Sequence, residues 1–125
     1  MQSQSKKMVF ELLKYIPKGK VTTYGFIAAF LQINSPRVVG NILHKNKSPE
    51  IYPCHRVIKS DGTLASSYAF GGLDAQKKLL QAEGIRFVNG RTDLKKYAWQ
   101  PDALVKNHFD TLLSHKISQY IKNLS

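Results

Sequence analysis

The sequence has one cysteine, Cys54, among its 125 residues, so it cannot form an internal disulfide and carries no mark of secretion. No run of apolar residues reaches the length of a membrane span, and the first residues lack the apolar core of a signal peptide. Cysteine and histidine never recur at the spacing of a zinc site. These absences predict an intracellular protein, cytoplasmic or nucleoid-associated, with no membrane partner, no metal and no cofactor.

Acidic residues are scarce. Eight Asp and Glu stand against nineteen Lys and Arg, which gives a formal net charge of +11. The excess is concentrated in residues 5–59, which hold ten basic and two acidic side chains. A surplus of this kind predicts a polyanionic partner, nucleic acid before any other.

Helical patterns dominate the first half of the chain. Apolar residues recur at helical spacing over 8–16. A second helix is expected over 24–32 and a third over 36–46, where Ser35 is a favourable N-cap and Pro36 suits the first helical position. Only a short turn separates these two helices, so the pair predicts a helix-turn-helix.

The second half of the chain predicts shorter elements. Residues 54–65 have the pattern of two short strands around a Ser-Asp-Gly turn. A helix is expected over 73–84, where Gly84 ends it, and a strand over 85–90. From Asp102 onward, apolar residues at helical spacing predict a terminal amphipathic helix.

The fold expected from these elements is mainly α with a short β-wing. A winged-helix-like domain containing the helix-turn-helix would span residues 1–101, and the terminal amphipathic helix, packed on it, residues 102–125. The outer face of the second helix of the motif carries Arg37, Asn41, His44 and Lys45. Such a face is either simply solvated or in contact with DNA, and the charge of this region favours DNA.

Cys54 stands between Pro53 and His55. A lone cysteine is most often buried and unreactive. Reactivity requires a thiolate, which neighbouring cations or a base stabilise, and His55 and Arg56 follow directly. In a regular strand, adjacent side chains point to opposite faces, so contact between Cys54 and His55 requires a bend or a bridging water. The residues alone leave both interpretations of Cys54 open.

Four segments occur along the chain in the following order: "GKVTTYGFIAAFL", "PRVVG", "PCHRVIKSDG" and "GGLDAQKKLLQAEGI". Together they resemble the DNA-binding, active-site domain of the O6-alkylguanine-DNA alkyltransferases, the methylated-DNA–protein-cysteine methyltransferases. The resemblance runs from about Val9 to Phe87. It implies DNA repair on double-stranded DNA containing O6-alkylguanine. The base is flipped, and its alkyl (methyl) group moves irreversibly from O6 to Cys54 in a single turnover. In this family the second helix of the motif enters the minor groove.

The same resemblance implies the catalytic roles. Cys54 is the alkyl acceptor, and His55 takes the thiol proton through a water. Glu83 orients His55, and Tyr24 protonates guanine N3 as the base leaves. Asn46 helps to hold the turn that carries the cysteine.

Further residues are implied at the DNA and around the base. Arg37 would enter the base stack and fill the gap left by the flipped guanine. The residues expected at the DNA are Thr23, Tyr24, Arg37, Asn41, Lys45 and Arg56. Those expected to line the base and alkyl pocket are Val57, Ser66, Ser67 and Tyr68.

Two other functions compete with the enzyme. Full-length relatives usually have an additional N-terminal domain, and residues 93–101 resemble the alkyltransferase-like proteins, which replace the cysteine and bind the lesion without removing it. The first alternative is therefore a monomeric lesion-binding module that recruits an excision-repair protein. The second is a winged-helix regulator that uses Cys54 as a sensor. The retained cysteine favours the enzyme, also expected to be a monomer.

Overall fold

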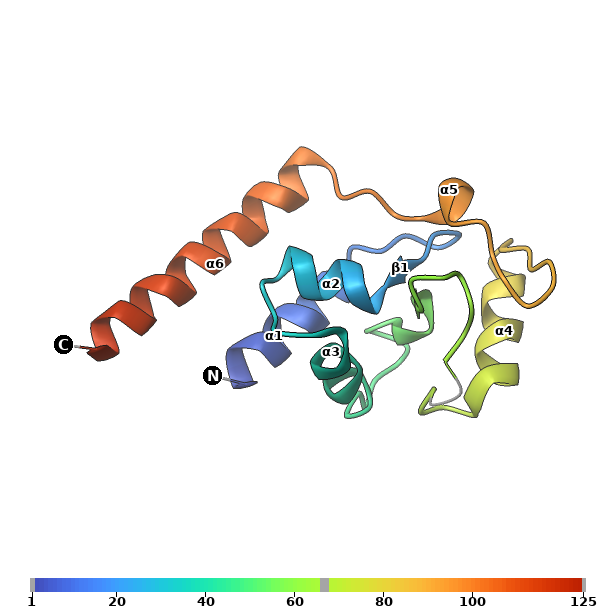
Figure 1. Ribbon diagram of the computed structural model, residues 1–125, viewed down its shortest axis with the longest axis horizontal. Coiled ribbons are helices and arrows are strands. Elements are labelled where there is room, and N and C mark those ends of the chain that lie inside the picture. Colours follow the sequence, from blue (N-terminus) through green and yellow to red (C-terminus); the bar gives the residue numbers. More distant parts are fainter. Residues whose placement is uncertain (1, 66–67, 125) are drawn as a thin grey trace.

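The computed structural model of the chain describes residues 2–65 and 68–124, which form helices around a small sheet (Figure 1). In chain order the elements are α1 (Gln2–Leu13), β1 (Thr22–Thr23), α2 (Tyr24–Phe30), α3 (Pro36–Leu43), the 3-10 turn η1 (Cys54–Arg56), β2 (Val57–Ile58), α4 (Gly72–Ala82), α5 (Leu94–Tyr97) and α6 (Ala103–Leu124). The predicted mainly α class is confirmed. Within these residues, no helix combines the length and apolar character needed to cross a membrane.

Helices α2 and α3 pack against each other at the centre of the molecule, with α1 against α3. Helices α2 and α3 each begin at a side-chain cap. At α2 the Thr23 hydroxyl accepts a hydrogen bond from the Phe26 amide (3.0 Å), and at α3 the Ser35 hydroxyl accepts one from the Val38 amide (3.4 Å). The predicted N-cap of α3 is therefore present. Helix α3 ends at Leu43, earlier than the sequence indicates.

Two clusters of buried apolar side chains hold the elements together. The larger joins α1, α2 and α3 to η1 and α6, and includes Leu12, Ile27 and Phe109, each fully buried. The smaller joins the sheet to α4 and α5 through Val21, Ile58, Leu80, Ile85 and Tyr97. Because Cys54 belongs to the larger cluster and Ile58 to the smaller, the segment that carries the cysteine is fixed between two cores.

The sheet differs from the expected two strands within residues 54–65. Only β2 is a strand there, and it pairs in parallel with β1 rather than with the chain that follows it. The predicted Ser-Asp-Gly turn is present, closed by a hydrogen bond from the Lys59 amide to the Thr63 carbonyl (3.0 Å). No second strand forms because the backbone groups have other partners. Strand β2 pairs with β1, and the Gly62 carbonyl accepts a hydrogen bond from the Thr92 amide (3.0 Å).

The strand expected over residues 85–90 is replaced by a turn. A single bridge joins Val88 to Arg91, and the intervening Asn89 and Gly90 both have positive φ, 53° and 76°. An Asn-Gly pair favours such a tight turn over an extended strand. The short helix α5, which was not predicted from the sequence, follows this turn.

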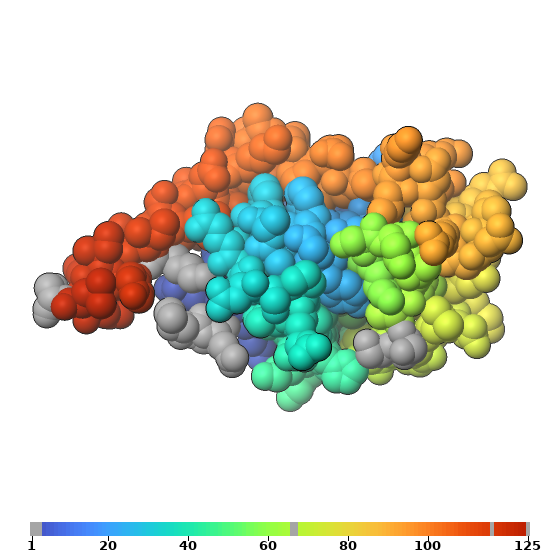
Figure 2. Space-filling view, in the orientation of Figure 1, coloured from blue at the N-terminus to red at the C-terminus, as the bar shows by residue number. Residues whose placement is uncertain are grey.

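Helix α6 confirms the predicted terminal helix. Asp102 caps its first turn, and Phe109 and Leu113 are buried in the larger core. Farther along, Ile117 and Ile121 are 50% and 60% exposed. Figures 1 and 2 show this end of α6 extending past the body of the molecule. The helix therefore packs on the domain through its first half.

Candidate active site

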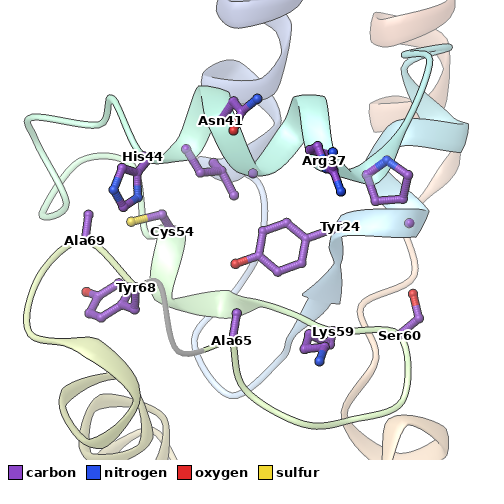
Figure 3. A pocket seen from close by; sticks show the side chains of 14 residues that line it. Tyr24, Arg37, Asn41, His44, Cys54, Lys59, Ser60, Ala65, Tyr68 and Ala69 are labelled. Atoms are coloured by element: carbon purple, nitrogen blue, oxygen red, sulfur yellow. The ribbon is translucent and has the colours of Figure 1, made fainter.

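Cys54 lies directly after a sharp bend in the chain. Its amide donates a hydrogen bond to the Tyr52 carbonyl (2.7 Å) across Pro53, whose φ of −74° and ψ of 71° are those of an inverse γ-turn. The chain then enters η1, so Cys54 and His55 do not alternate as strand residues. This bend buries Cys54, which is 5% exposed, and directs its Sγ into a pocket (Figure 3).

The pocket around Cys54 has a volume of about 670 Å³, within the range of about 300–1,000 Å³ usual for small-molecule sites. The Cys54 Sγ lies near His44 and Ala69, and the Tyr24 hydroxyl lies on its other side (Figure 3). Among the described lining residues none is acidic, which suits a site for part of a polyanion. They are Tyr24, Gly25, Pro36, Arg37, Gly40, Asn41, Leu43, His44, Cys54, Lys59, Ser60, Ala65, Tyr68 and Ala69.

The Cys54 thiol is protonated at rest. Burial raises its pKa, and the hydrogen bond from the Asn46 side chain offsets only part of that rise. Asn46 is itself buried and fixed: its Nδ2 donates to the Tyr52 carbonyl (2.9 Å), and its Oδ1 accepts from the Ser48 amide (2.9 Å). A thiolate at Cys54 therefore requires a base.

The nearest base in sequence, His55, is held by a buried carboxylate. Its Nε2 lies 2.8 Å from Glu83 Oε2, with both side chains about one-tenth exposed. Burial raises the pKa of Glu83, but hydrogen bonds from Arg56 and His55 outweigh burial and leave it below its ordinary value. Glu83 is therefore a carboxylate at neutral pH, oriented toward the imidazole.

Arg56 points into the protein, in contrast to the DNA contact predicted for it. Its Nε and Nη2 donate to the two oxygens of Glu83 at 3.0 and 2.8 Å, and its Nη1 donates to the Ile16 carbonyl at 2.8 Å. A guanidinium engaged in this fork geometry has each of its nitrogens committed within the fold. Arg56 therefore orients Glu83, which in turn orients His55.

Gln76 belongs to the site, although it was not predicted from the sequence. It is 1% exposed, and its Nε2 donates to the carbonyls of His55 and Val57, both at 3.0 Å. These two bonds fasten the end of η1 to α4. The available signal was its spacing from Leu80, four residues on, which turns both side chains toward the protein interior.

Tyr24 and Tyr68 both line the pocket with Cys54 (Figure 3). Burial, followed by the negative charge of a Cys54 thiolate, raises the pKa of Tyr24. The same causes raise the pKa of Tyr68 to about 12. Both phenols therefore keep their protons at neutral pH and can donate hydrogen bonds.

The predicted residues divide into two groups. Those that meet around the pocket are Tyr24, Arg37, Asn41, Cys54 and Tyr68. Of the others, Thr23 caps α2, Lys45 is exposed outside the pocket lining, and Val57 is fully buried in the larger core, where the first position of β2 directs it. Ser66 and Ser67 lie outside the described residues.

His44 and Lys59 also line the pocket, although neither was proposed as a site residue. His44 follows Arg37 by seven residues, or two helical turns, and was predicted to lie on the same outer face. Lys59 directly follows β2 at the turn, and its positive charge was the only sequence feature that indicated a role in the site. In the part of the chain that the structure describes, no cluster of histidine, cysteine and acidic residues could hold a metal ion.

Comparison with known sequences identifies the family. The family model for the DNA-binding domain of 6-O-methylguanine DNA methyltransferase matches residues 4–85. The chain belongs to this family of DNA-repair, DNA-binding domains.

Curated relatives are of two lengths. The bifunctional methyltransferase/endonuclease of Picrophilus torridus is 39% identical over 104 residues, which are 82% of this chain and 32% of that protein. The methylated-DNA–protein-cysteine methyltransferase of Thermococcus kodakarensis is 41% identical over 81 residues, 64% of this chain and 44% of that protein. The DNA base-flipping protein of Vibrio parahaemolyticus is 41% identical over 95 residues, 74% of this chain and 93% of that protein. The chain thus spans less than half of the first two relatives and almost all of the third.

The similar solved structures also differ in length: this chain covers almost all of one and less than half of the other. S. pombe Atl1, in complex with damaged DNA containing O6-carboxymethylguanine, matches with a TM-score of 0.70 and 31% identity over 79% of this chain and 97% of that chain. The O6-methylguanine-DNA methyltransferase from Pyrococcus kodakaraensis matches with a TM-score of 0.57 and 41% identity, over 64% of this chain and 46% of that chain. The family likeness therefore extends from the sequence to the fold.

Proposed function

We propose that this protein repairs O6-alkylguanine in double-stranded DNA by transferring the alkyl group irreversibly to Cys54. One observation carries the proposal: a buried cysteine points into a pocket whose described lining residues include no acid, and the next residue, His55, is hydrogen-bonded through Glu83 to Arg56. A cysteine that served only as core packing would need neither the opening nor a histidine bound to a charged carboxylate.

The reaction uses these groups as follows. His55 accepts the Cys54 proton through a water on its Nδ1 side, because its Nε2 is bound to Glu83. The thiolate attacks the alkyl carbon; the S–C bond forms as the C–O6 bond breaks, and the electron pair remains on guanine. Tyr24, whose raised pKa keeps it protonated, donates its proton to N3 of the leaving base. Solvent reprotonates Tyr24 after the repaired base departs.

Access to O6 requires the base to leave the duplex, at a cost of a few kcal/mol. Arg37 is exposed at the start of α3 and lines the pocket, so it can occupy the vacated stack. We interpret α2, α3 and the turn after β2 as a winged helix-turn-helix with α3 in the minor groove, where Thr23, Asn41 and Lys45 contact DNA. Residues 1–101 form this module and 102–125 an appended helix of a monomer that acts at the nucleoid.

A lesion-binding protein without transfer is the second candidate. It is favoured by the coverage of short relatives: 97% of S. pombe Atl1 and 93% of the Vibrio base-flipping protein correspond to this chain. In that role the pocket would hold the flipped base while an excision-repair protein is recruited.

Transfer is tested directly with duplex DNA that contains O6-methylguanine. The enzyme is expected to lose free thiol in proportion to the lesion, with one methyl group located on Cys54 by mass spectrometry. The Cys54→Ser variant should bind the duplex and transfer nothing. Binding of the lesion by the unaltered protein with no methyl on Cys54 would reject the enzyme in favour of the binding protein. Equal binding of plain and damaged DNA, with no methyl group on Cys54, would reject both and favour the regulator.

A further inference from the structure

One end of the pocket is not used by the repair reaction. The Cys54 Sγ lies toward His44 and Ala69, and the Tyr24 hydroxyl lies on the opposite side of the sulfur (Figure 3). With Tyr24 at guanine N3, the base occupies the Tyr24 side and its O6 substituent points to Cys54. Atoms of the substituent beyond its first carbon then extend toward His44.

This end of the pocket offers hydrogen-bond donors. His44 is exposed at the C-terminal end of α3, and its side chain forms no hydrogen bond or ion pair with any residue in the described ranges. Its imidazole carries an N–H in either protonation state. Tyr68 lines the same pocket, and its hydroxyl remains protonated at neutral pH.

The charge of the pocket has one sign. Arg37 and Lys59 line it together with His44, and no described lining residue is acidic. Arg37 and Lys59 lie beyond Tyr24 from Cys54, whereas His44 lies beside the Cys54 sulfur (Figure 3). His44 is therefore available for the substituent.

We propose that His44 is a specificity-determining residue that favours lesions whose O6 substituent is longer than methyl and ends in a carboxylate. The proposal rests on the function proposed above and names the substrate class of the same site. A methyl group ends at Cys54 and does not extend to His44. A carboxylate attached to the transferred carbon extends to the His44 N–H, and such a charge-assisted bond is stronger than one to a neutral group.

The test compares two substituents of equal size. Duplexes of one sequence carry guanine, O6-methylguanine, O6-carboxymethylguanine or O6-carbamoylmethylguanine, in which an amide replaces the carboxylate. Binding is measured by fluorescence anisotropy with the full chain in a Cys54→Ser background, which prevents transfer during the titration. The readout is the ratio of the dissociation constants for the carbamoylmethyl and carboxymethyl duplexes.

With His44 present, the carboxymethyl duplex should bind about fivefold to tenfold more tightly than its neutral counterpart. His44→Phe, which keeps a ring and removes the donors, should bring this ratio close to one, and His44→Arg should restore it. Lys45→Gln is the matched control: Lys45 is the next residue, exposed and outside the pocket lining, so its loss should weaken all four duplexes alike and leave the ratio unchanged.

Two results would overturn the proposal. If His44→Phe weakens every duplex equally, His44 contacts phosphate rather than the substituent. If the ratio is near one with His44 present, or stays high in His44→Phe, the residue does not select the carboxylate. Failure of the proposed function has a separate signature: the unaltered protein, incubated with the O6-methylguanine duplex, would carry no methyl group on Cys54, whatever the ratio measured in the Cys54→Ser background.

Discussion

Glu83→Gln tests whether the buried carboxylate organises the site. Glu83 accepts three hydrogen bonds, two from Arg56 and one from His55, and these side chains are between 10% and 16% exposed. Glutamine keeps the shape but removes the charge and one acceptor oxygen. Removing one partner of a fully buried ion pair costs about 3–5 kcal/mol. The partial exposure here lowers the expected loss to about 2–3 kcal/mol.

This loss should be visible in urea unfolding as a fall of about 1–2 M in the midpoint, with an unchanged slope. Glu50→Gln is the control, because Glu50 is an exposed residue of the same type with no ion pair among the residues that the structure describes. A Glu83→Gln protein as stable as Glu50→Gln would refute the reasoning. Methyl transfer should slow about 100-fold in Glu83→Gln, since His55 loses the acceptor that orients it.

The pH dependence of the same variant has a defined sign. The pKa of Glu83 is lower in the folded protein than in the unfolded chain, so its stabilising effect is complete above the unfolded pKa of about 4.3. The effect disappears as pH falls through the lower, folded pKa. The stability difference between the unaltered protein and Glu83→Gln should therefore be constant near neutral pH and shrink below about pH 4. A difference that grows on acidification would contradict the lowered pKa.

Three further predictions follow from single contacts. Gln76→Leu should lower stability by about 2 kcal/mol in urea unfolding, since two buried carbonyls lose their donor. Gly62→Ala should destabilise by more than Gly90→Ala in the same measurement: both glycines have positive φ, but only at Gly62 would a Cβ meet the Thr92 carbonyl oxygen, at 2.6 Å. Arg37→Ala should slow transfer from duplex DNA but leave the reaction of the Cys54 thiol with a small soluble alkylating agent unchanged, as followed by mass spectrometry. Equal losses at the two glycines, or equal effects of Arg37→Ala on both reactions, would contradict these assignments.

The longer helices could be predicted because their signals are local, whereas the four-residue helix α5 could not. Ser35 caps α3 as its sequence indicates, and the apolar spacing after Asp102 corresponds to α6. The sheet could not be predicted in the same way. The parallel pairing of β1 with β2 joins residues 35 positions apart in the chain, and nothing in a two-residue strand announces its partner.

In the candidate site, too, some features could be predicted from the sequence and others could not. The identity of Cys54 as a candidate acceptor follows from sequence resemblance, but the role of Arg56 does not, because a basic residue beside a reactive cysteine is equally suited to DNA or to a buried carboxylate. Only the fold brings Glu83 next to Arg56 from 27 residues away. Gln76 was missed because its spacing from Leu80 indicates the buried face of α4 but not the two backbone carbonyls that its amide binds.

The contacts of Asn46, Gln76, Glu83 and His55 help to distinguish a protein that transfers the alkyl group from one that only binds the lesion. A protein that only holds a flipped base needs the pocket, Arg37 and a rigid turn, and Asn46 and Gln76 already fasten the two ends of that turn through backbone carbonyls. A charged Glu83 adds the cost of burying a carboxylate, which Arg56 offsets only because it is buried as well. The hydrogen bond that His55 donates from Nε2 to this carboxylate fixes the ring, with its other nitrogen available as a proton acceptor. Burial raises the pKa of the Cys54 thiol, which makes such an acceptor necessary for transfer and superfluous for binding.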